Sequence, residues 1–270
     1  MVATRCAVLG SPIAHSLSPV LHRTAYAEAG LDWSYDAVEV KAADLAGFLD
    51  GLGDEWRGLS LTMPLKRAVL PLLDVTSPTA SLVGTANTVL FEDGIRWGDN
   101  TDVPGAVAAV QERYVGPLHT AEVIGGGATA ASMLVALARL GVTRVSVVAR
   151  DLGRAKETVA LAERVFGADN AVGRTRDEGA SEPVDVLVST IPASAKAPAV
   201  EQRVALAKLV FDVVYDPWPT PLANAALAGG VPFVSGLDLL VHQAALQFTL
   251  MTGLEAPLEA MRASGEAALA

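Results

Sequence analysis

Residues 123–131 read Val-Ile-Gly-Gly-Gly-Ala-Thr-Ala-Ala and lie near the middle of the chain. Residues 121–124 predict a short buried strand before the glycines, and the Ala- and Leu-rich residues 128–140 predict a helix after them. Glycines at such a junction let the backbone turn sharply and expose N–H groups at the positive end of the helix dipole. The stretch therefore indicates a Rossmann-type turn that binds the pyrophosphate of a dinucleotide.

The strand that follows the turn bears on the choice of cofactor, because a glycine-rich turn can also be a purely structural loop. Residues 144–149 predict this strand; Arg150 follows it, and Arg154 comes one helical turn later. Ala149 offers no side-chain acceptor for a ribose 2′-hydroxyl, whereas two guanidinium groups suit a 2′-phosphate. Both arginines can equally be solvated surface residues, and Asp151 can either neutralise Arg150 or cap the next helix. The sequence favours NADP over NAD.

Strands alternate with amphipathic helices along the whole chain, which predicts right-handed βαβ units and an α/β fold. We expect Pro104-Gly105 to break the pattern before a helix that ends near residue 114. Because the glycine turn comes so late, something other than a cofactor domain must occupy the residues before it. The expected strands are 3–9, 34–40, 57–61, 87–91, 95–97, 120–124, 144–149, 185–189, 209–214 and 231–234, and the expected helices are 18–29, 42–50, 65–73, 128–140, 152–166, 199–207, 220–228 and 237–249.

Composition narrows the class of protein. With 270 residues, 51% of them hydrophobic, the chain can build one large core or two domains. A net charge of -10 argues against nucleic acid as the main partner. The single cysteine, Cys6, lies in an apolar run, so we expect it to be a buried residue of a strand. We find no leader before it and no run long enough to cross a bilayer, so we expect a cytoplasmic protein without a membrane partner. The spacing of the histidines predicts no metal site.

Polar residues follow several predicted strands of the first half, where ligands of α/β sheets usually bind. Ser16 and Ser18 stand close together in the run 10–19, and similar polar runs occupy 60–66, 83–88 and 98–102. A structural explanation exists for each run. Ser18 before a proline is typical of a helix cap, and Asn, Asp and Gly are ordinary turn formers.

Together, these runs resemble the shikimate dehydrogenase family over essentially the whole chain. The matching motifs, in chain order, are Gly-Ser-Pro-Ile-Ala-His-Ser-x-Ser-Pro at 10–19, Thr-x-Pro-x-Lys at 62–66, Gly-x-Ala-Asn-Thr at 84–88, Asp-Asn-Thr-Asp at 99–102, the glycine turn, Tyr-Asp-Pro-x-x-Thr-Pro-Leu at 215–222 and Gly-Leu-x-x-Leu-x-x-Gln-Ala at 236–244. The resemblance implies two α/β domains. A mixed-sheet substrate domain would comprise residues 1–102 and 237–270, and a Rossmann-like NADP domain would comprise residues 103–236.

The resemblance also implies an activity, the reversible NADP-dependent reduction of 3-dehydroshikimate to shikimate. Lys66 and Asp102 would be the catalytic pair. The implied substrate-binding residues are Ser16, Ser18, Thr62, Lys66, Asn87, Asp102, Tyr215 and Gln243; here the resemblance replaces capping as the explanation of Ser18. The implied cofactor-binding residues are Gly125, Gly126, Gly127, Ala128, Arg150, Arg154, Ser189, Thr190, Gly236 and Leu239.

Several positions depart from the family pattern. Ala128 stands where another glycine is common, Ala149-Arg150-Asp151 replaces Asn-Arg-Thr, Val188–Pro192 replaces the more usual Asn-Ala-Thr-Ser, and Leu239 stands where many members have Met. None of these changes affects Lys66 or Asp102. As an ammonium, Lys66 can stabilise developing oxyanion charge and deliver a proton, while Asp102 holds it in place.

Two other functions remain open at this point. One is a quinate/shikimate or aminoshikimate dehydrogenase that uses NAD, and the other is a non-catalytic dinucleotide-sensing homologue. Retention of Lys66 and Asp102 argues against the second. The expected partner is a small-molecule substrate, and the expected assembly is a monomer or homodimer.

Overall fold

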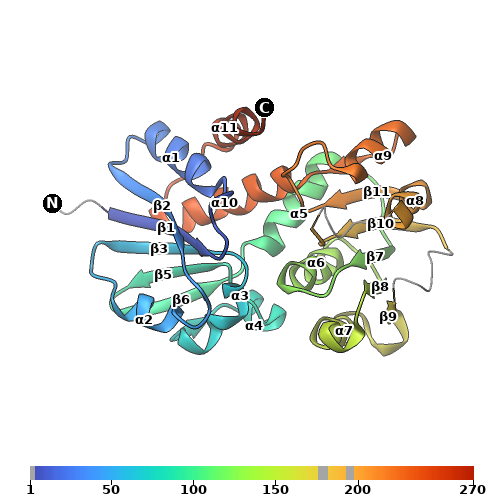
Figure 1. The fold of residues 1–270 in the computed structure, drawn as a ribbon, viewed down its shortest axis with the longest axis horizontal. Coiled ribbons are helices and arrows are strands. Elements are labelled where there is room, and N and C mark those ends of the chain that lie inside the picture. Colours follow the sequence, from blue (N-terminus) through green and yellow to red (C-terminus); the bar gives the residue numbers. More distant parts are fainter. Residues whose placement is uncertain (1–3, 176–181, 193–197) are drawn as a thin grey trace. The chain divides into compact units, whose positions relative to one another are not determined.

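The computed structural model describes residues 4–175, 182–192 and 198–270. Their elements are drawn in Figure 1, and the chain divides into two compact units. The first unit contains Met1–Asp102 and Leu240–Ala270, and the second contains Val103–Leu239. The chain therefore returns from the second unit to the first between Leu239 and Leu240. This boundary lies inside helix α10 (Gly236–Thr252), slightly beyond the expected boundary at 236/237.

The first unit is built on a mixed six-stranded sheet with the order β2-β1-β3-β5-β6-β4. Strand β1 runs parallel to both of its neighbours, whereas β5 pairs antiparallel with β3 and with β6. Cys6 lies on β1 with no exposed surface, as expected, and burial raises the pKa of its thiol to about 11. The strands are β1 (Thr4–Gly10), β2 (Trp33–Glu39), β3 (Trp56–Leu61), β4 (Val75–Thr76), β5 (Thr88–Glu92) and β6 (Ile95–Asp99).

Helices and two loops complete the first unit. The loops that follow β1 and β3 lie together, because Ser11 N–H donates to the Met63 carbonyl at 3.0 Å. A side chain at Gly10 would collide with Thr62, so only glycine permits this approach. The helices are α1 (Ser18–Glu28), α2 (Leu45–Asp50), α3 (Leu65–Ala68), α4 (Pro78–Val83) and α11 (Leu258–Leu269), with a 3₁₀ turn, η1 (Leu70–Leu72).

The second unit holds a fully parallel six-stranded sheet with the order β12-β11-β10-β7-β8-β9. Numbered from β7, this is the 3-2-1-4-5-6 order of dinucleotide-binding sheets, with the topological switch between β7 and β10. The predicted α/β class and the Rossmann-like domain are confirmed. The strands are β7 (Thr120–Ile124), β8 (Arg144–Ala149), β9 (Ala171–Thr175), β10 (Val184–Ser189), β11 (Ala207–Asp212) and β12 (Phe233–Val234).

The helices of the second unit follow local sequence signals. Gly127 is the N-cap of α6, and Gly141, with φ +95°, lies just past its end. Asp151 caps α7 and Thr220 caps α9, each accepting a backbone N–H. The helices are α5 (Asp102–Arg113), α6 (Ala128–Arg139), α7 (Leu152–Phe166), α8 (Pro198–Gln202) and α9 (Pro221–Gly229), with 3₁₀ turns η2 (Ala168–Asn170) and η5 (Arg203–Leu206). Within the described ranges, none of the helices has the length and apolar character that a membrane crossing requires.

Three expectations about local structure were wrong. Pro104-Gly105 does not break the chain, because both residues lie in the first turn of α5, where proline is tolerated. Ser18 does not cap α1; Leu17 occupies the N-cap position. Finally, β4, α4 and β9 were not expected. Each is short, and the turn-rich composition of residues 74–86 hid both β4 and the helix that Ser77 caps.

Candidate active site

Lys66 and Asp102 form a close ion pair in the first unit. Lys66 lies on α3, just beyond the end of β3, and Asp102 follows β6 as the first residue of α5. Lys66 Nζ is 2.5 Å from Asp102 Oδ2, and the two side chains are only 13% and 6% exposed. A pair so poorly hydrated is electrostatically stronger than a surface pair, and its geometry is correspondingly well defined.

Asn87 ties this pair to its surroundings. The two hydrogens on its Nδ2 are shared among three acceptors, Asp102 Oδ1 at 2.9 Å, Thr101 Oγ1 at 2.9 Å and Gln243 Oε1 at 3.2 Å. Its Oδ1 accepts from the Thr101 backbone N–H at 2.8 Å and from the Thr88 hydroxyl at 2.9 Å. With both ends of its amide engaged, Asn87 fixes the carboxylate of Asp102 through the oxygen that Lys66 does not bind.

Ser16 and Thr62 lie on the two loops that meet beyond β1 and β3, and Ser18 is the first residue of α1, directly after the first of these loops. Ser16 Oγ accepts from the Ser18 N–H at 3.3 Å, which links the two serines directly. The Thr62 N–H donates to the Leu9 carbonyl at 2.9 Å. Ser18 is buried, and its side chain interacts with Tyr35, which acts to lower the Tyr35 pKa. The parallel pairing of β1 with β3 thus gathers the expected substrate residues from separate parts of the sequence.

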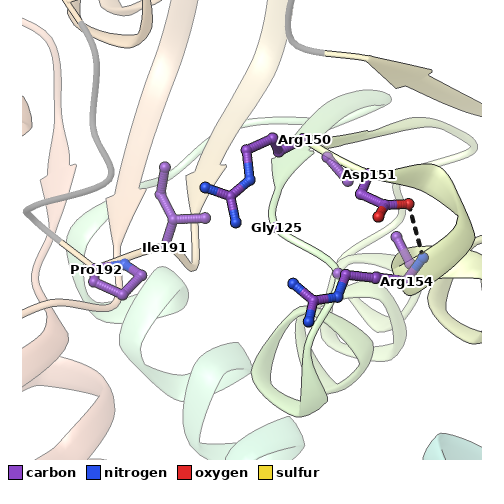
Figure 2. Close-up of a pocket in the computed structure, with 9 residues that line it drawn as sticks. Gly125, Arg150, Asp151, Arg154, Ile191 and Pro192 are labelled. Carbon is purple, nitrogen blue, oxygen red and sulfur yellow. Dashed lines mark hydrogen bonds between the residues drawn. The ribbon is translucent and has the colours of Figure 1, made fainter.

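A cavity of about 350 Å³ opens at the carboxyl ends of the strands in the second unit. Figure 2 shows that the guanidinium groups of Arg150 and Arg154 both point into it. Neither arginine forms an ion pair with any described residue, so both charges face the open space. The lining residues are Gly125, Gly126, Ala149, Arg150, Asp151, Arg154, Ala155, Ile191 and Pro192.

From the sequence, Asp151 could either neutralise Arg150 or cap a helix; in the structure it caps a helix. Its Oδ1 accepts from the Arg154 backbone N–H at 3.1 Å, drawn as the dashed line in Figure 2. The carboxylate is therefore the N-cap of α7. It does not pair with the Arg150 side chain, and the positive charge of Arg150 is left for a ligand.

The glycine turn approaches its neighbours too closely for side chains. Gly125, with φ +128°, has no room for a Cβ beside the Thr190 hydroxyl, and a Cβ on Gly126 would strike Ala155 of α7. Gly127 and Ala128 begin α6, so the turn presents the N-terminus of that helix, as a pyrophosphate site requires.

Ser189 and Thr190 differ in their position relative to the cavity and in their burial. Thr190 lies beside the glycine turn, and its hydroxyl donates to the Ile124 carbonyl at 3.0 Å. Ser189 is fully buried, and it is not among the residues that line the cavity. The expected contact of Ser189 with the cofactor is therefore not supported, because its side chain has no exposed surface to offer a ligand.

Tyr215, Gly236 and Leu239 belong to the second unit. None of the three is among the residues that line the cavity. Gly236 begins α10 against the backbone of Val213 and Val214, where no Cβ fits. Two residues later, Asp238 accepts from Arg113 Nη2 at 2.7 Å and from the Ser235 N–H at 2.9 Å. These charge-assisted bonds lower the pKa of Asp238 against the opposing effect of burial.

Sequence reasoning missed several residues of both sites. Thr101 contacts Asn87, and Ile191 and Pro192 line the cavity; all three lay in polar or proline-containing runs after strands, which was the available signal. Gln247 also contacts the Asn87 segment, and nothing in its apolar surroundings pointed to it. Across the described ranges, no three His, Cys, Asp or Glu side chains gather as a metal site would require.

Known proteins share both the sequence and the fold. Residues 8–89 match the family model of the shikimate dehydrogenase substrate binding domain, and residues 236–264 match that of the shikimate 5′-dehydrogenase C-terminal domain. The shikimate dehydrogenase (NADP⁺) of Moorella thermoacetica is 35% identical over 268 residues, covering 94% of this chain and 90% of the relative.

Two solved structures agree in fold along nearly the full length. Mycobacterium tuberculosis shikimate dehydrogenase superposes with a TM-score of 0.88 and 43% identity, covering 98% of this chain and 99% of the other. Shikimate 5-dehydrogenase from Thermus thermophilus, solved in complex with NADP(H) and shikimate, gives a TM-score of 0.83 and 32% identity, covering 98% and 100%. With the Lys66–Asp102 pair and the arginine-lined cavity in place, this chain belongs to the shikimate dehydrogenase family.

Proposed function

We propose that this protein is an NADP-dependent shikimate dehydrogenase that interconverts 3-dehydroshikimate and shikimate. The observation that carries the proposal is the buried Lys66–Asp102 pair, held by Asn87 in a chain that is homologous to shikimate dehydrogenases over nearly its whole length. An acid–base group next to a fixed carboxylate suits the reduction of a ketone, in which the oxygen must gain a proton.

The first unit binds the substrate in this proposal. Ser16 and Ser18 bind the substrate carboxylate, while Thr62, Asn87, Asp102 and Gln243 contact the ring hydroxyls. Lys66 donates a proton to the oxygen during reduction and accepts it during oxidation. Asp102 keeps the ammonium oriented, because one of its oxygens is bound by Lys66 and the other by Asn87. Tyr215, which belongs to the second unit, is the remaining proposed substrate contact.

The second unit binds NADP, which supplies the hydride. The geometry fits this cofactor in two respects. The glycine turn at 125–127 leaves a helix N-terminus open for a pyrophosphate, and Arg150 and Arg154 extend unpaired charges into the adjoining cavity. Two guanidinium groups suit the 2′-phosphate, and Thr190, Gly236 and Leu239 are proposed contacts of the remaining cofactor.

Steady-state kinetics of the purified chain tests the proposal. Initial rates are measured with shikimate and with quinate, each with NADP⁺ and with NAD⁺. We expect kcat/KM to be highest for shikimate with NADP⁺. A preference for quinate or for NAD⁺ would favour the alternative dehydrogenase, and no turnover with any pair would point to a dinucleotide-binding homologue without activity.

We further propose that the protein acts in the cytoplasm as a monomer or homodimer with small molecules as its partners. Light scattering of the purified chain measures its mass in solution. A mass beyond that of two chains would contradict the proposed assembly.

A further inference from the structure

Three side chains form a buried hydrogen-bonded chain beneath the candidate substrate site. Tyr35 Oη donates to Ser60 Oγ at 2.5 Å, and Ser60 Oγ donates to Gln247 Oε1 at 2.7 Å. Tyr35 is 0% exposed, Ser60 4% and Gln247 1%. The three residues come from β2, β3 and α10, so this set of hydrogen bonds exists only when the first unit is folded. We call it the Tyr35–Ser60–Gln247 relay.

One end of the relay reaches Asn87. Gln247 Nε2 donates to the Asn87 carbonyl at 3.1 Å and to the Thr88 hydroxyl at 2.9 Å. That hydroxyl in turn donates to Asn87 Oδ1 at 2.9 Å. Gln247 therefore fixes both the backbone and, through Thr88, the side chain of the residue that holds Asp102. Since Asp102 positions Lys66, the relay ends one residue away from the catalytic pair.

The other end of the relay reaches the serines. The Tyr35 hydroxyl, which donates to Ser60, also interacts with the Ser18 side chain, and this interaction acts to lower the Tyr35 pKa. Burial raises the pKa of Tyr35, so this hydroxyl stays protonated. His22 stacks on the Tyr35 ring with centroids 4.1 Å apart, and burial lowers its pKa to about 3, so the stack is uncharged at neutral pH. Hydrogen bonds in such a dry environment are strong and direction-specific.

We propose that Tyr35, Ser60 and Gln247 are positioning residues of the dehydrogenase reaction, which couple the carboxylate-binding serines to the Lys66–Asp102 pair. The proposal rests on the proposed function. Gln247 acts mainly on catalysis by holding Asn87, and Tyr35 acts mainly on binding by holding Ser18. Ser60 links the two residues, because it hydrogen-bonds both Tyr35 and Gln247. A purely structural network would instead affect stability without separating kcat from KM.

Two conservative variants test the relay. Gln247→Met keeps the length of the side chain but removes all three of its hydrogen bonds, and we expect kcat to fall about tenfold. Tyr35→Phe keeps the ring and its stacking on His22, and we expect KM for shikimate to rise several-fold with kcat nearly unchanged. In the double variant, the loss of kcat/KM should differ by about threefold or more from the product of the single losses, because both side chains act through Ser60.

Thr252→Val is the matched control, because it removes a hydroxyl on the same helix that makes two hydrogen bonds outside the relay, to the Phe248 carbonyl at 2.8 Å and from the Leu254 N–H at 3.1 Å. It should leave kcat and KM unchanged, and melting temperatures of all variants report folding. The relay is refuted if the wild-type chain is active and the single variants have wild-type kinetic constants, or if the losses simply multiply. Kinetic changes of the same kind in Thr252→Val would refute it as well.

Hydrogen exchange tests the relay without turnover, so it separates failure of the relay from failure of the proposed function. The Thr101 N–H donates to Asn87 Oδ1 at 2.8 Å and reports on the far end of the relay. We expect Gln247→Met to speed exchange at Thr101, while Thr252→Val leaves it unchanged. Unchanged exchange in Gln247→Met would show that Gln247 does not hold Asn87, whatever the activity of the wild-type chain.

Discussion

Lys66 Nζ and Asp102 Oδ2 lie 2.5 Å apart, while the second oxygen of the same carboxylate accepts from Asn87. The carboxylate is therefore held at both oxygens, and it cannot rotate away from the lysine without breaking a buried hydrogen bond. An ammonium has three N–H donors. Its bond to Asp102 leaves two of them for a substrate oxygen, which is the arrangement that proton delivery needs.

Replacing Lys66 should separate chemistry from binding. We expect Lys66→Ala to lower kcat by ~10²–10⁴-fold, the usual contribution of a positioned acid–base group, while shikimate affinity changes little. Stopped assays give kcat, and calorimetry gives the affinity. Arg67→Ala, which removes the neighbouring cation on α3, is the control and should keep near-normal turnover. A near-normal kcat in Lys66→Ala would remove the lysine from the reaction.

Asp102→Asn should lower kcat and raise KM for shikimate. The amide keeps the shape of the side chain but removes the negative charge, and it turns one acceptor into a donor that faces either Lys66 or Asn87. We expect lower kcat together with a higher KM for shikimate, since Asp102 also contacts the substrate in our proposal. Steady-state rates check this expectation. If only KM rises, Asp102 is a binding residue and does not orient Lys66.

Arg150→Ala should weaken NADP⁺ selectively. Removing a charge-assisted contact to the 2′-phosphate should raise KM for NADP⁺ by about 10- to 100-fold and leave KM for NAD⁺ nearly unchanged. Arg144→Ala provides the control, because Arg144 is exposed at the opposite end of the same strand, β8. Equal losses for the two cofactors would argue that Arg150 does not contact the 2′-phosphate.

His22 should make stability depend on pH. Burial lowers its pKa from 6.5 to about 3, so between these values the unfolded chain binds a proton that the folded chain does not. The free energy of unfolding should therefore fall as pH decreases through this window, by about 1.4 kcal/mol per pH unit from this group alone. His22→Phe should show a flatter profile in urea unfolding from pH 7 to pH 4. Replacement of the exposed His15 by Asn should not flatten it, and a wild-type slope in His22→Phe would contradict this account.

The sequence predicted those features that depend on local chemistry. The glycine turn at 125–127 and the buried strand before it indicated the second unit, and the alternating strands and helices around them supported this prediction. Arg150 and Arg154 were predicted as cofactor contacts from their place after the next strand, and the structure places both at the cavity. Asp151 could not be resolved in the same way, because capping and ion pairing are both possible for an Asp at that point until its backbone geometry is known.

Long-range polar contacts were beyond sequence reasoning. Gln247 lies in an apolar helix, and its partners Ser60 and Asn87 come from distant strands, so no spacing reveals the contact. Ser18 was explained as a helix cap because a serine before proline is a common local signal, yet the chain starts its helix one residue earlier and buries the hydroxyl against Tyr35. Ser189 was expected at the cofactor from the family resemblance, which does not show which way its side chain points in this chain.

The cap formed by Asp151 limits how this protein could acquire a preference for NAD. A carboxylate that binds the ribose 2′-hydroxyl is the usual device for NAD, and Asp151 is the one acid among the described lining residues of the cavity. Recruiting it would leave the start of α7 uncapped, at a cost of about 1 kcal/mol. Engineering such a switch would therefore require a new acid at position 149 in addition to the loss of Arg150. No single substitution supplies both changes, so a change of preference from NADP to NAD requires at least two substitutions.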